Sequence, residues 1–250
     1  MEAKEAVFVA IESISQKESV FSVRNLKEAA LRHTLIGKTI VPIHAIEQCI
    51  EQHIENQTLY EAVDPLTQRN MLTTPWALTM ETETLARINA NQGIVKPIAN
   101  TASVTRLINE FEGHSTYGLT PSQKNALHHT FTSSDRFQAV QGYAGAGKTT
   151  MLQLTKQLAE EKGFVLRGIA VTSSAVNELR KKAGIHADVF PIVHQELLHA
   201  KKNSLQNTIF VLDEASMLST IQGHELIKLI VLPQKSHLLL KKCDVKVHLS

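Results

Sequence analysis

The chain has 250 residues, 43% of them hydrophobic and 20% charged, which is enough to bury one good core or two small ones. No apolar stretch approaches the roughly 18 residues of a membrane span, and acidic residues interrupt the N-terminal segment. We therefore expect a cytoplasmic protein without membrane insertion. The formal net charge is +2. The part of the chain before Gly118 has 10 basic and 14 acidic residues, a net charge of −4, and the part after it has 16 basic and 10 acidic residues, a net charge of +6. The basic second half suits a polyanionic partner, although a solvated surface explains it equally well.

Residues 1–66 contain three stretches with apolar residues at helical spacing. These stretches are residues 4–14, 23–33 and 42–54, and an extended segment around residues 59–63 follows them. The pattern predicts a mainly helical, winged-helix-like module. A plain helical bundle accounts for the same pattern.

Residues 67–118 read as a helical connector. Thr73, Thr74 and Pro75 form a capping sequence with proline in the first turn, which predicts a helix to about Asn91. Beyond it the pattern is weaker, with one short helix expected near residues 104–111.

From residue 119 to 240, short apolar runs alternate with helical stretches. Strand, helix, strand, helix and strand in this order predict an α/β domain with a parallel sheet. The last residues, 241–250, are expected to form an irregular tail.

The strongest motif is the phosphate-binding loop, or Walker A spacing G-x-x-x-x-G-K-[ST], at residues 142–149. An apolar strand precedes it and a helix from about Lys148 to Lys162 follows, so backbone amides and the helix dipole would surround a phosphate. Lys148 would neutralise the outer phosphates, and Thr149 would bind Mg²⁺. A structural glycine turn is the weaker explanation, because so specific a spacing is rare by chance. The expected nucleotide contacts are Gly142, Ala144, Gly145, Ala146, Gly147, Lys148, Thr149 and Thr150.

Asp213 and Glu214 follow the apolar strand of residues 208–212. In an open parallel sheet, ligands bind at the carboxyl ends of the strands. Asp213 would hold Mg²⁺, and Glu214 would orient and deprotonate the attacking water. Acids after a strand are common, but here they follow the phosphate loop in an alternating α/β pattern.

Three further side chains have weaker signals. Gln123 follows a proline-opened helix start and could face a purine edge. Thr172 and Ser173 end a strand, where they would cap the next helix or contact nucleic-acid phosphates.

The segments LTPSQ (119–123), GYAGAGKTT (142–150), IAVTSSAVNEL (169–179) and FVLDEASM (210–217) together resemble the first half of a RecD-like superfamily 1 DNA helicase. They are most similar to the helicase part of the TraI/TrwC-type conjugative relaxase-helicases, and the resemblance extends over about residues 5–230. It implies a P-loop NTPase with a RecA-like first motor domain, ATP and Mg²⁺ as cofactors, and single-stranded DNA and the conjugation machinery as partners.

Carried over to this chain, the resemblance makes Gln123 the adenine reader, Thr172 a DNA contact, and Lys148 and Glu214 catalytic residues. Val171 stands where the family usually has proline. The chain shows no pattern of a nicking domain, so a relaxase activity is not expected.

Near the C-terminus the family has a strand ending in G-D-x-x-Q, whereas this chain has cysteine and valine at the glycine and glutamine positions. We expect an incomplete sheet and a truncated motor domain that binds ATP weakly and unwinds little or no DNA alone. The alternative is a non-catalytic DNA-binding or secretion-recognition module with a remnant phosphate loop. A small nucleotide kinase is a weaker third reading.

Overall fold

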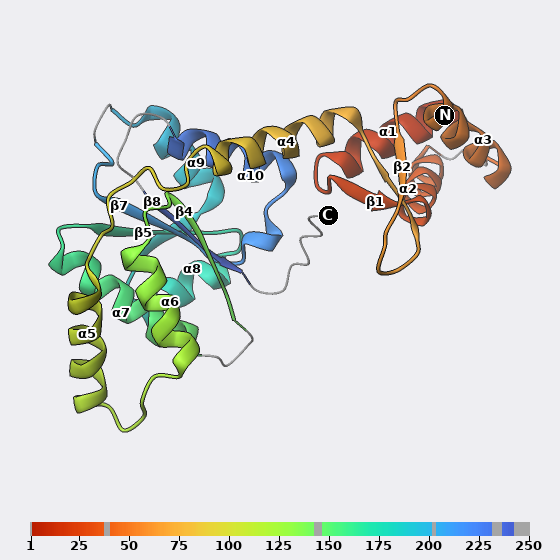
Figure 1. The fold of residues 1–250 in the computed structure, drawn as a ribbon. Helices are drawn as coiled ribbons and strands as arrows, with labels where there is room; N and C mark the ends of the chain where they lie inside the picture. Colours follow the sequence, from red (N-terminus) through yellow and green to blue (C-terminus); the bar gives the residue numbers. More distant parts are fainter. Residues whose placement is uncertain (1, 38–40, 143–146, 202–203, 232–236, 243–250) are drawn as a thin grey trace. The chain divides into compact units, whose positions relative to one another are not determined.

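The computed structural model describes residues 2–37, 41–142, 147–201, 204–231 and 237–242, the last of these by their backbone only. The chain divides into two compact units (Figure 1). The first comprises Met1–Leu85 and Ser219–Glu225, and the second Ala86–Leu218 and Leu226–Ser250. The division falls inside the segment 67–118 that was expected to be a connector.

The first unit combines three helices with a small antiparallel sheet. Its elements are α1 (Ala3–Ser15), β1 (Val20–Ser22), α2 (Val23–Ile36), α3 (Ile43–Glu55), β2 (Tyr60–Val63), β3 (Asn70–Thr73) and the start of α4 (Pro75–Asn89). The strands lie in the order β1-β3-β2. The expected helices and the extended segment near residues 59–63 are present, and the winged-helix assignment stays a prediction.

Local sequence explains where these helices begin. The side chain of Ser22 accepts a hydrogen bond from the backbone N–H of Asn25 at 3.0 Å and caps α2. Thr74 caps α4 in the same way, accepting from the N–H of Ala77 at 3.1 Å, with Pro75 as the first helical residue. The expected start of α4 is therefore confirmed, and its last residue is Asn89 rather than Asn91.

The second unit contains the parallel sheet and its helices. Its elements are α5 (Thr101–His114), α6 (Pro121–Thr132), β4 (Phe137–Gln141), α7 (Lys148–Glu161), β5 (Val165–Ala170), α8 (Ser173–Ala183), β6 (His186–Val189), α9 (Phe190–His199), β7 (Thr208–Leu212), a 3₁₀ turn at Ala215–Met217, α10 (Thr220–Val231), which begins in the first unit, and β8 (His237–Lys242). Helix α5 is longer than the short helix expected near residues 104–111.

The strand order is β4-β8-β7-β5-β6, and every pairing is parallel. The expected α/β fold with a parallel sheet is confirmed. Helices cover both faces of this sheet (Figure 1), as a parallel sheet requires. On β7, Ile209 and Val211 belong to the core cluster shared with α5–α8, whereas Phe210 and Leu212 belong to the cluster shared with α9 and α10. Successive side chains of β7 therefore pack into the hydrophobic cores on opposite faces of the sheet.

Strand β8 lies between β4 and β7 and extends to Lys242. Two residues of the segment 241–250, which was expected to be irregular, are therefore part of the sheet. Residues 243–250 lie outside the described residues. Within the part of the chain that the structure describes, no helix is both long and apolar enough to cross a membrane.

Candidate nucleotide site

The phosphate-loop motif lies between β4 and α7, as its spacing predicts. Gly147 precedes the first residue of α7 and has a φ of +73°, in the left-handed region that glycine adopts readily. The first backbone N–H groups of a helix have no partner within the helix and can bind an anion. Ala144, Gly145 and Ala146, which are also expected to contact the nucleotide, lie outside the described residues.

Lys148 and the threonines after it occupy the first turn of α7. The Nζ of Lys148 donates a hydrogen bond to the carbonyl oxygen of Gly142 at 2.7 Å, so the side chain reaches back to the beginning of the loop. Thr149 and Thr150 are half-buried. The geometry brings an ammonium group and two hydroxyl-bearing residues to the end of the loop.

Asp213 and Glu214 follow the last residue of β7. Asp213 is only 5% exposed, and its backbone N–H donates to the carbonyl of Ile169 at 2.9 Å, which continues the pairing with β5. Its Oδ1 accepts from the N–H of Glu214 at 2.9 Å. Glu214 itself has a φ of +54°, a conformation that costs of order 1–3 kcal/mol in a residue with a side chain. Such strain occurs often at functional sites, where it directs a side chain.

Thr172 connects Glu214 to the start of α8. Its Oγ1 accepts from the N–H of Ala175 at 3.2 Å, which is the capping role expected of it. The same hydroxyl donates to Oε2 of Glu214 at 3.4 Å. Ser173, the first residue of α8, is exposed. The hydroxyl group expected to contact DNA is thus also within reach of the carboxylate expected to act on water.

Gln123 lies in the first turn of α6 and takes part in a capping box. Its Oε1 accepts from the N–H of Thr120 at 2.8 Å, and the hydroxyl of Thr120 accepts from the N–H of Gln123 at 3.3 Å. A methyl group built on Gly147 would overlap Nε2 of Gln123. The glutamine is therefore in contact with the end of the phosphate loop. The capping box was missed from the sequence, although T-P-S-Q carries its signature.

The carboxyl ends of β4, β5 and β7 lie at the same edge of the sheet, because all the strands are parallel. This edge brings together the phosphate-loop end, the acidic pair and Thr172. A carboxylate, a hydroxyl and the phosphates of a nucleotide are ligands that suit Mg²⁺. Among the described residues there is no group of three or more His, Cys, Asp or Glu side chains that could hold a metal ion.

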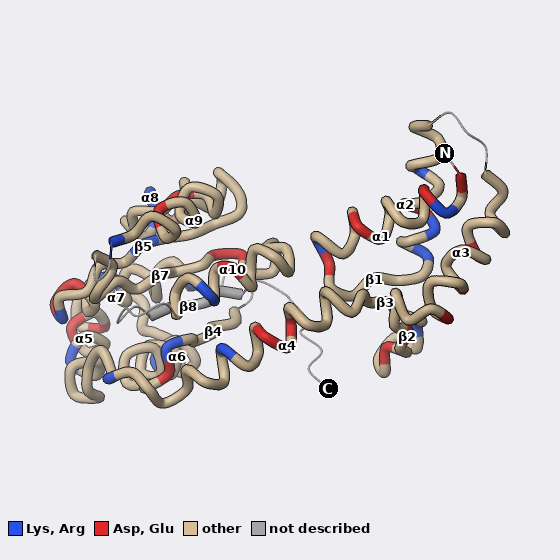
Figure 2. Tube along the Cα trace, turned by 90° about the horizontal axis from the view of Figure 1, so that it is seen from above, with Lys and Arg blue, Asp and Glu red and all other residues tan. Residues whose placement is uncertain are grey.

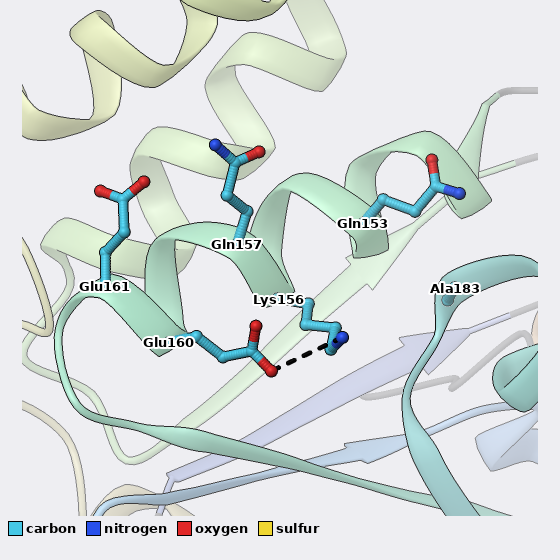
Figure 3. Close-up of a pocket in the computed structure, with 6 residues that line it drawn as sticks. All are labelled: Gln153, Lys156, Gln157, Glu160, Glu161 and Ala183. Carbon is cyan, nitrogen blue, oxygen red and sulfur yellow. Dashed lines mark ion pairs between the residues drawn. The ribbon is translucent and has the colours of Figure 1, made fainter.

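A hollow of about 430 Å³ lies along α7, and none of the expected site residues lines it (Figure 3). Its lining residues are Gln153, Lys156, Gln157, Glu160, Glu161 and Ala183. Lys156 and Glu160 form an ion pair at 3.5 Å within it. The hollow therefore lies beyond the first turn of α7, away from the phosphate-binding end of the helix.

Comparison with known proteins identifies the family of this part of the chain. Residues 118–239 match the AAA domain family. The chain is 34% identical over 123 residues to the multifunctional conjugation protein TraI of Escherichia coli (strain K12), a match that covers 46% of this chain and 7% of that protein. It is 38% identical over 112 residues to the probable conjugal transfer protein TraA of Sinorhizobium fredii (strain NBRC 101917 / NGR234), covering 45% and 10%.

A third relative is the conjugal transfer protein TraA of Rhizobium radiobacter, with 36% identity over 106 residues, 42% of this chain and 9% of that protein. The matched segment thus spans a tenth or less of these relatives. It is also shorter than the range 5–230 expected from the sequence, so the resemblance of the first unit stays a prediction. Residues 118–239 form a P-loop AAA domain with a RecA-like sheet, and over rather less than half of its length this chain is a homologue of the TraA and TraI conjugation proteins.

Proposed function

We propose that the second unit binds ATP and Mg²⁺ as the nucleotide-binding part of a DNA motor used in plasmid conjugation. The observation that carries this proposal is the common sheet edge. The Lys148 end of the phosphate loop and the Asp213–Glu214 pair lie at the carboxyl ends of β4 and β7, which flank β8. The homology to conjugation proteins supports the same assignment.

Each residue has a chemical role in this proposal. The backbone amides of residues 142–150 would bind the phosphates, and Lys148 would neutralise the negative charge that develops during transfer. Thr149 and Asp213 would hold Mg²⁺, which supplies charge stabilisation when bound. Glu214 would orient the attacking water and accept its proton.

Single-stranded DNA is the proposed second ligand. Thr172 and Ser173 begin α8, where a helix N-terminus favours phosphate groups, and the half of the chain after Gly118 carries the positive balance of charge. We also propose a role beside the conjugation machinery, in the cytoplasm where ATP is available, and the homology to conjugal transfer proteins supports this role.

For this 250-residue chain tested alone, we propose ATP binding with little turnover and little or no unwinding. In motors of this kind an arginine from a second RecA-like domain reaches the γ-phosphate, and arginine fingers contribute about 10³–10⁵-fold to the rate. The described residues of the second unit contain one such sheet, of five strands.

A steady-state and single-turnover ATPase assay, with and without single-stranded DNA, tests this proposal. We expect slow hydrolysis that falls at least about 100-fold further in Glu214→Gln, while Mg²⁺-ATP binding is retained, because only the general base is lost. Turnover at the rate of a complete motor would refute the proposed low activity. If Glu214→Gln hydrolyses ATP as fast as the wild-type chain, Glu214 is not the general base.

The alternative, a DNA-binding module in the first unit, has less support from charge. Helix α3 carries Glu47, Glu51 and Glu55 but no lysine or arginine (Figure 2). In a winged-helix module the recognition helix enters the major groove between the two phosphate backbones, and α3 is the helix that would take that place here. An acidic helix is repelled there, so we place the DNA contact in the second unit.

A further inference from the structure

The carboxylate of Glu112, near the end of α5, ties three segments together at the start of α6. It accepts a hydrogen bond from the backbone N–H of Leu119 at 2.9 Å, and the Nζ of Lys124 on α6 lies 2.8 Å from it. A methyl group built on Gly118 would lie 3.0 Å from Oε1 of Glu112. The carboxylate therefore occupies the space beside the turn that leads from α5 into α6.

The turn and the first residues of α6 form one connected unit. Leu119 is 7% exposed and belongs to the main core of the second unit. The next residue, Thr120, forms the capping box with Gln123, whose Nε2 lies against Gly147. An unbroken series of contacts thus runs from Glu112 to the end of the phosphate loop.

Helix α5 is itself held firmly against the sheet domain. Val104, Leu107 and Ile108 are buried in the core shared with α6 and α7. At the far end of α7, Glu161 accepts from Nη2 of Arg106 at 2.6 Å, and Lys162 donates to Ser103 at 3.1 Å. Because α5 is fixed at several points, Glu112 can act as a fixed anchor for the start of α6.

We propose that Glu112 is a positioning residue for nucleotide recognition: it holds the first turn of α6 so that Gln123 stays at the phosphate-loop end, within reach of a bound base. This inference rests on the proposed ATP site and adds a residue that does not touch the nucleotide. The hydrogen bond to Lys124, followed by that from Leu119, lowers the pKa of Glu112, so the anchor is charged at neutral pH.

The test compares two ligands, Mg²⁺-ATP and Mg²⁺-tripolyphosphate, by equilibrium titration. Tripolyphosphate occupies a phosphate loop but offers no base to Gln123. In Glu112→Ala we expect the dissociation constant for ATP to rise about three- to tenfold, the range of one orienting hydrogen bond, while that for tripolyphosphate is unchanged. Glu112→Gln keeps an acceptor for Leu119 and should give an intermediate value.

Two further variants separate positioning from general destabilisation. In a Gln123→Ala background, Glu112→Ala should have no additional effect on ATP affinity, because its influence passes through that glutamine. Glu110→Ala is the matched control. Glu110 lies on the same helix and pairs with Arg106 at 2.8 Å, so its loss should leave the preference for ATP unchanged.

The outcomes distinguish this inference from the function on which it rests. If the wild-type chain binds neither ligand, the proposed ATP site is wrong and the inference falls with it. If the wild-type chain prefers ATP and Glu112→Ala keeps the full preference, only the inference is wrong. An equal loss of both ligands, or an undiminished effect without Gln123, also overturns it. Should Glu112→Ala fail to fold, Glu112→Gln and Lys124→Met provide the same comparison.

Discussion

At the scale of single residues, Gly147 is a position of the phosphate loop where the structure requires glycine. Its φ of +73° lies in the left-handed region, and Nε2 of Gln123 fills the place of a side chain there. Two separate physical reasons therefore require glycine at this position. One is the backbone conformation, and the other is the close approach of the α6 side chain.

We expect Gly147→Ala to lower the free energy of unfolding by about 1–2 kcal/mol from the left-handed conformation alone, with a further loss from the contact with Gln123. Urea unfolding, monitored by circular dichroism, measures the total loss of unfolding free energy from both causes. Gly163→Ala is the matched control, since Gly163 has a φ of +77° and no neighbouring atom within 4 Å of a built methyl group. We expect Gly147→Ala to cost more unfolding free energy than Gly163→Ala, and the difference is the part that the contact with Gln123 causes. In a Gln123→Ala background this difference should disappear. If it persists, the proposed contact is contradicted.

At the scale of elements, the sheet edge formed by β5 and β6 is held by a group of charged side chains. The side chain of Arg167 on β5 is 11% exposed, and its Nη2 lies 2.7 Å from carboxylate oxygens of both Asp188 on β6 and Glu196 on α9. Arg180 on α8 pairs with the same Asp188. The carboxylate of Asp188 thus links β6 to β5 and α8. Removing its charge leaves the largely buried guanidinium of Arg167 with one ion-pair partner fewer.

Asp188→Asn should therefore lower the free energy of unfolding by about 1–3 kcal/mol at pH 7. Burial raises the pKa of Asp188, but the hydrogen bond and charge of Arg167 outweigh burial, so the net pKa lies below its ordinary value. A lowered pKa stabilises the fold above the unfolded value of about 4, and this contribution is lost as the pH falls through the folded value.

Urea unfolding at several pH values checks this prediction. The difference between wild type and Asp188→Asn should narrow below about pH 4, and a constant difference would argue against the ion pair as its source. Glu178→Gln serves as the control, because its i,i+4 pair with Lys182 is more than half exposed and contributes about 0–1 kcal/mol.

The sequence predicts the long elements with periodic apolar residues. It does not predict the shortest strands or the order in which strands pair. The helix expected from Lys148 to Lys162 is α7, and the strand before Asp213 is β7. By contrast, β1 has three residues, too few for any alternation to be visible. The position of β8 between β4 and β7 depends on pairing across the chain, which no local pattern contains.

The site shows the same limit. The spacing of residues 142–149 specifies a strand, a loop and a helix, so Lys148 could be located from the sequence alone. The contact of Thr172 with Glu214 joins residues 42 positions apart, and that of Glu112 with Leu119 crosses a turn between two helices. Such contacts depend on how helices pack, and the sequence gives no periodic signal for them.

At the scale of the whole molecule, each of the two units has a hydrophobic core of its own. The core of the first unit is formed by Val7, Ala10, Ile11, Phe21, Leu26, Ala30, Ile46, Cys49, Ile50, Leu59 and Leu72. The second unit has two clusters, one on each face of its sheet. Separate cores allow damage to one unit to remain local.

Leu26→Ala should destabilise the first unit by about 2–5 kcal/mol, since Leu26 is fully buried and its removal leaves a cavity. Hydrogen exchange measured by mass spectrometry should then show faster exchange in α1–α3 and unchanged exchange in β5 and β7. Leu158→Ala, at an equally buried position on α7, is the control. It should accelerate hydrogen exchange in β5 and β7 and leave exchange in α1–α3 unchanged. Uniform acceleration in both variants would mean that the units unfold together.

The most direct test of the central claim is an equilibrium titration of Mg²⁺-ATP into the wild-type chain, Lys148→Ala and the control Lys156→Ala, which also lies on α7 but beyond the phosphate-binding end. The account predicts saturable binding to the wild-type chain and to Lys156→Ala. It predicts that Lys148→Ala weakens binding about 10- to 100-fold, because a charge-assisted contact with the phosphates is lost. Equal affinity in Lys148→Ala, or no binding by the wild-type chain, would contradict it.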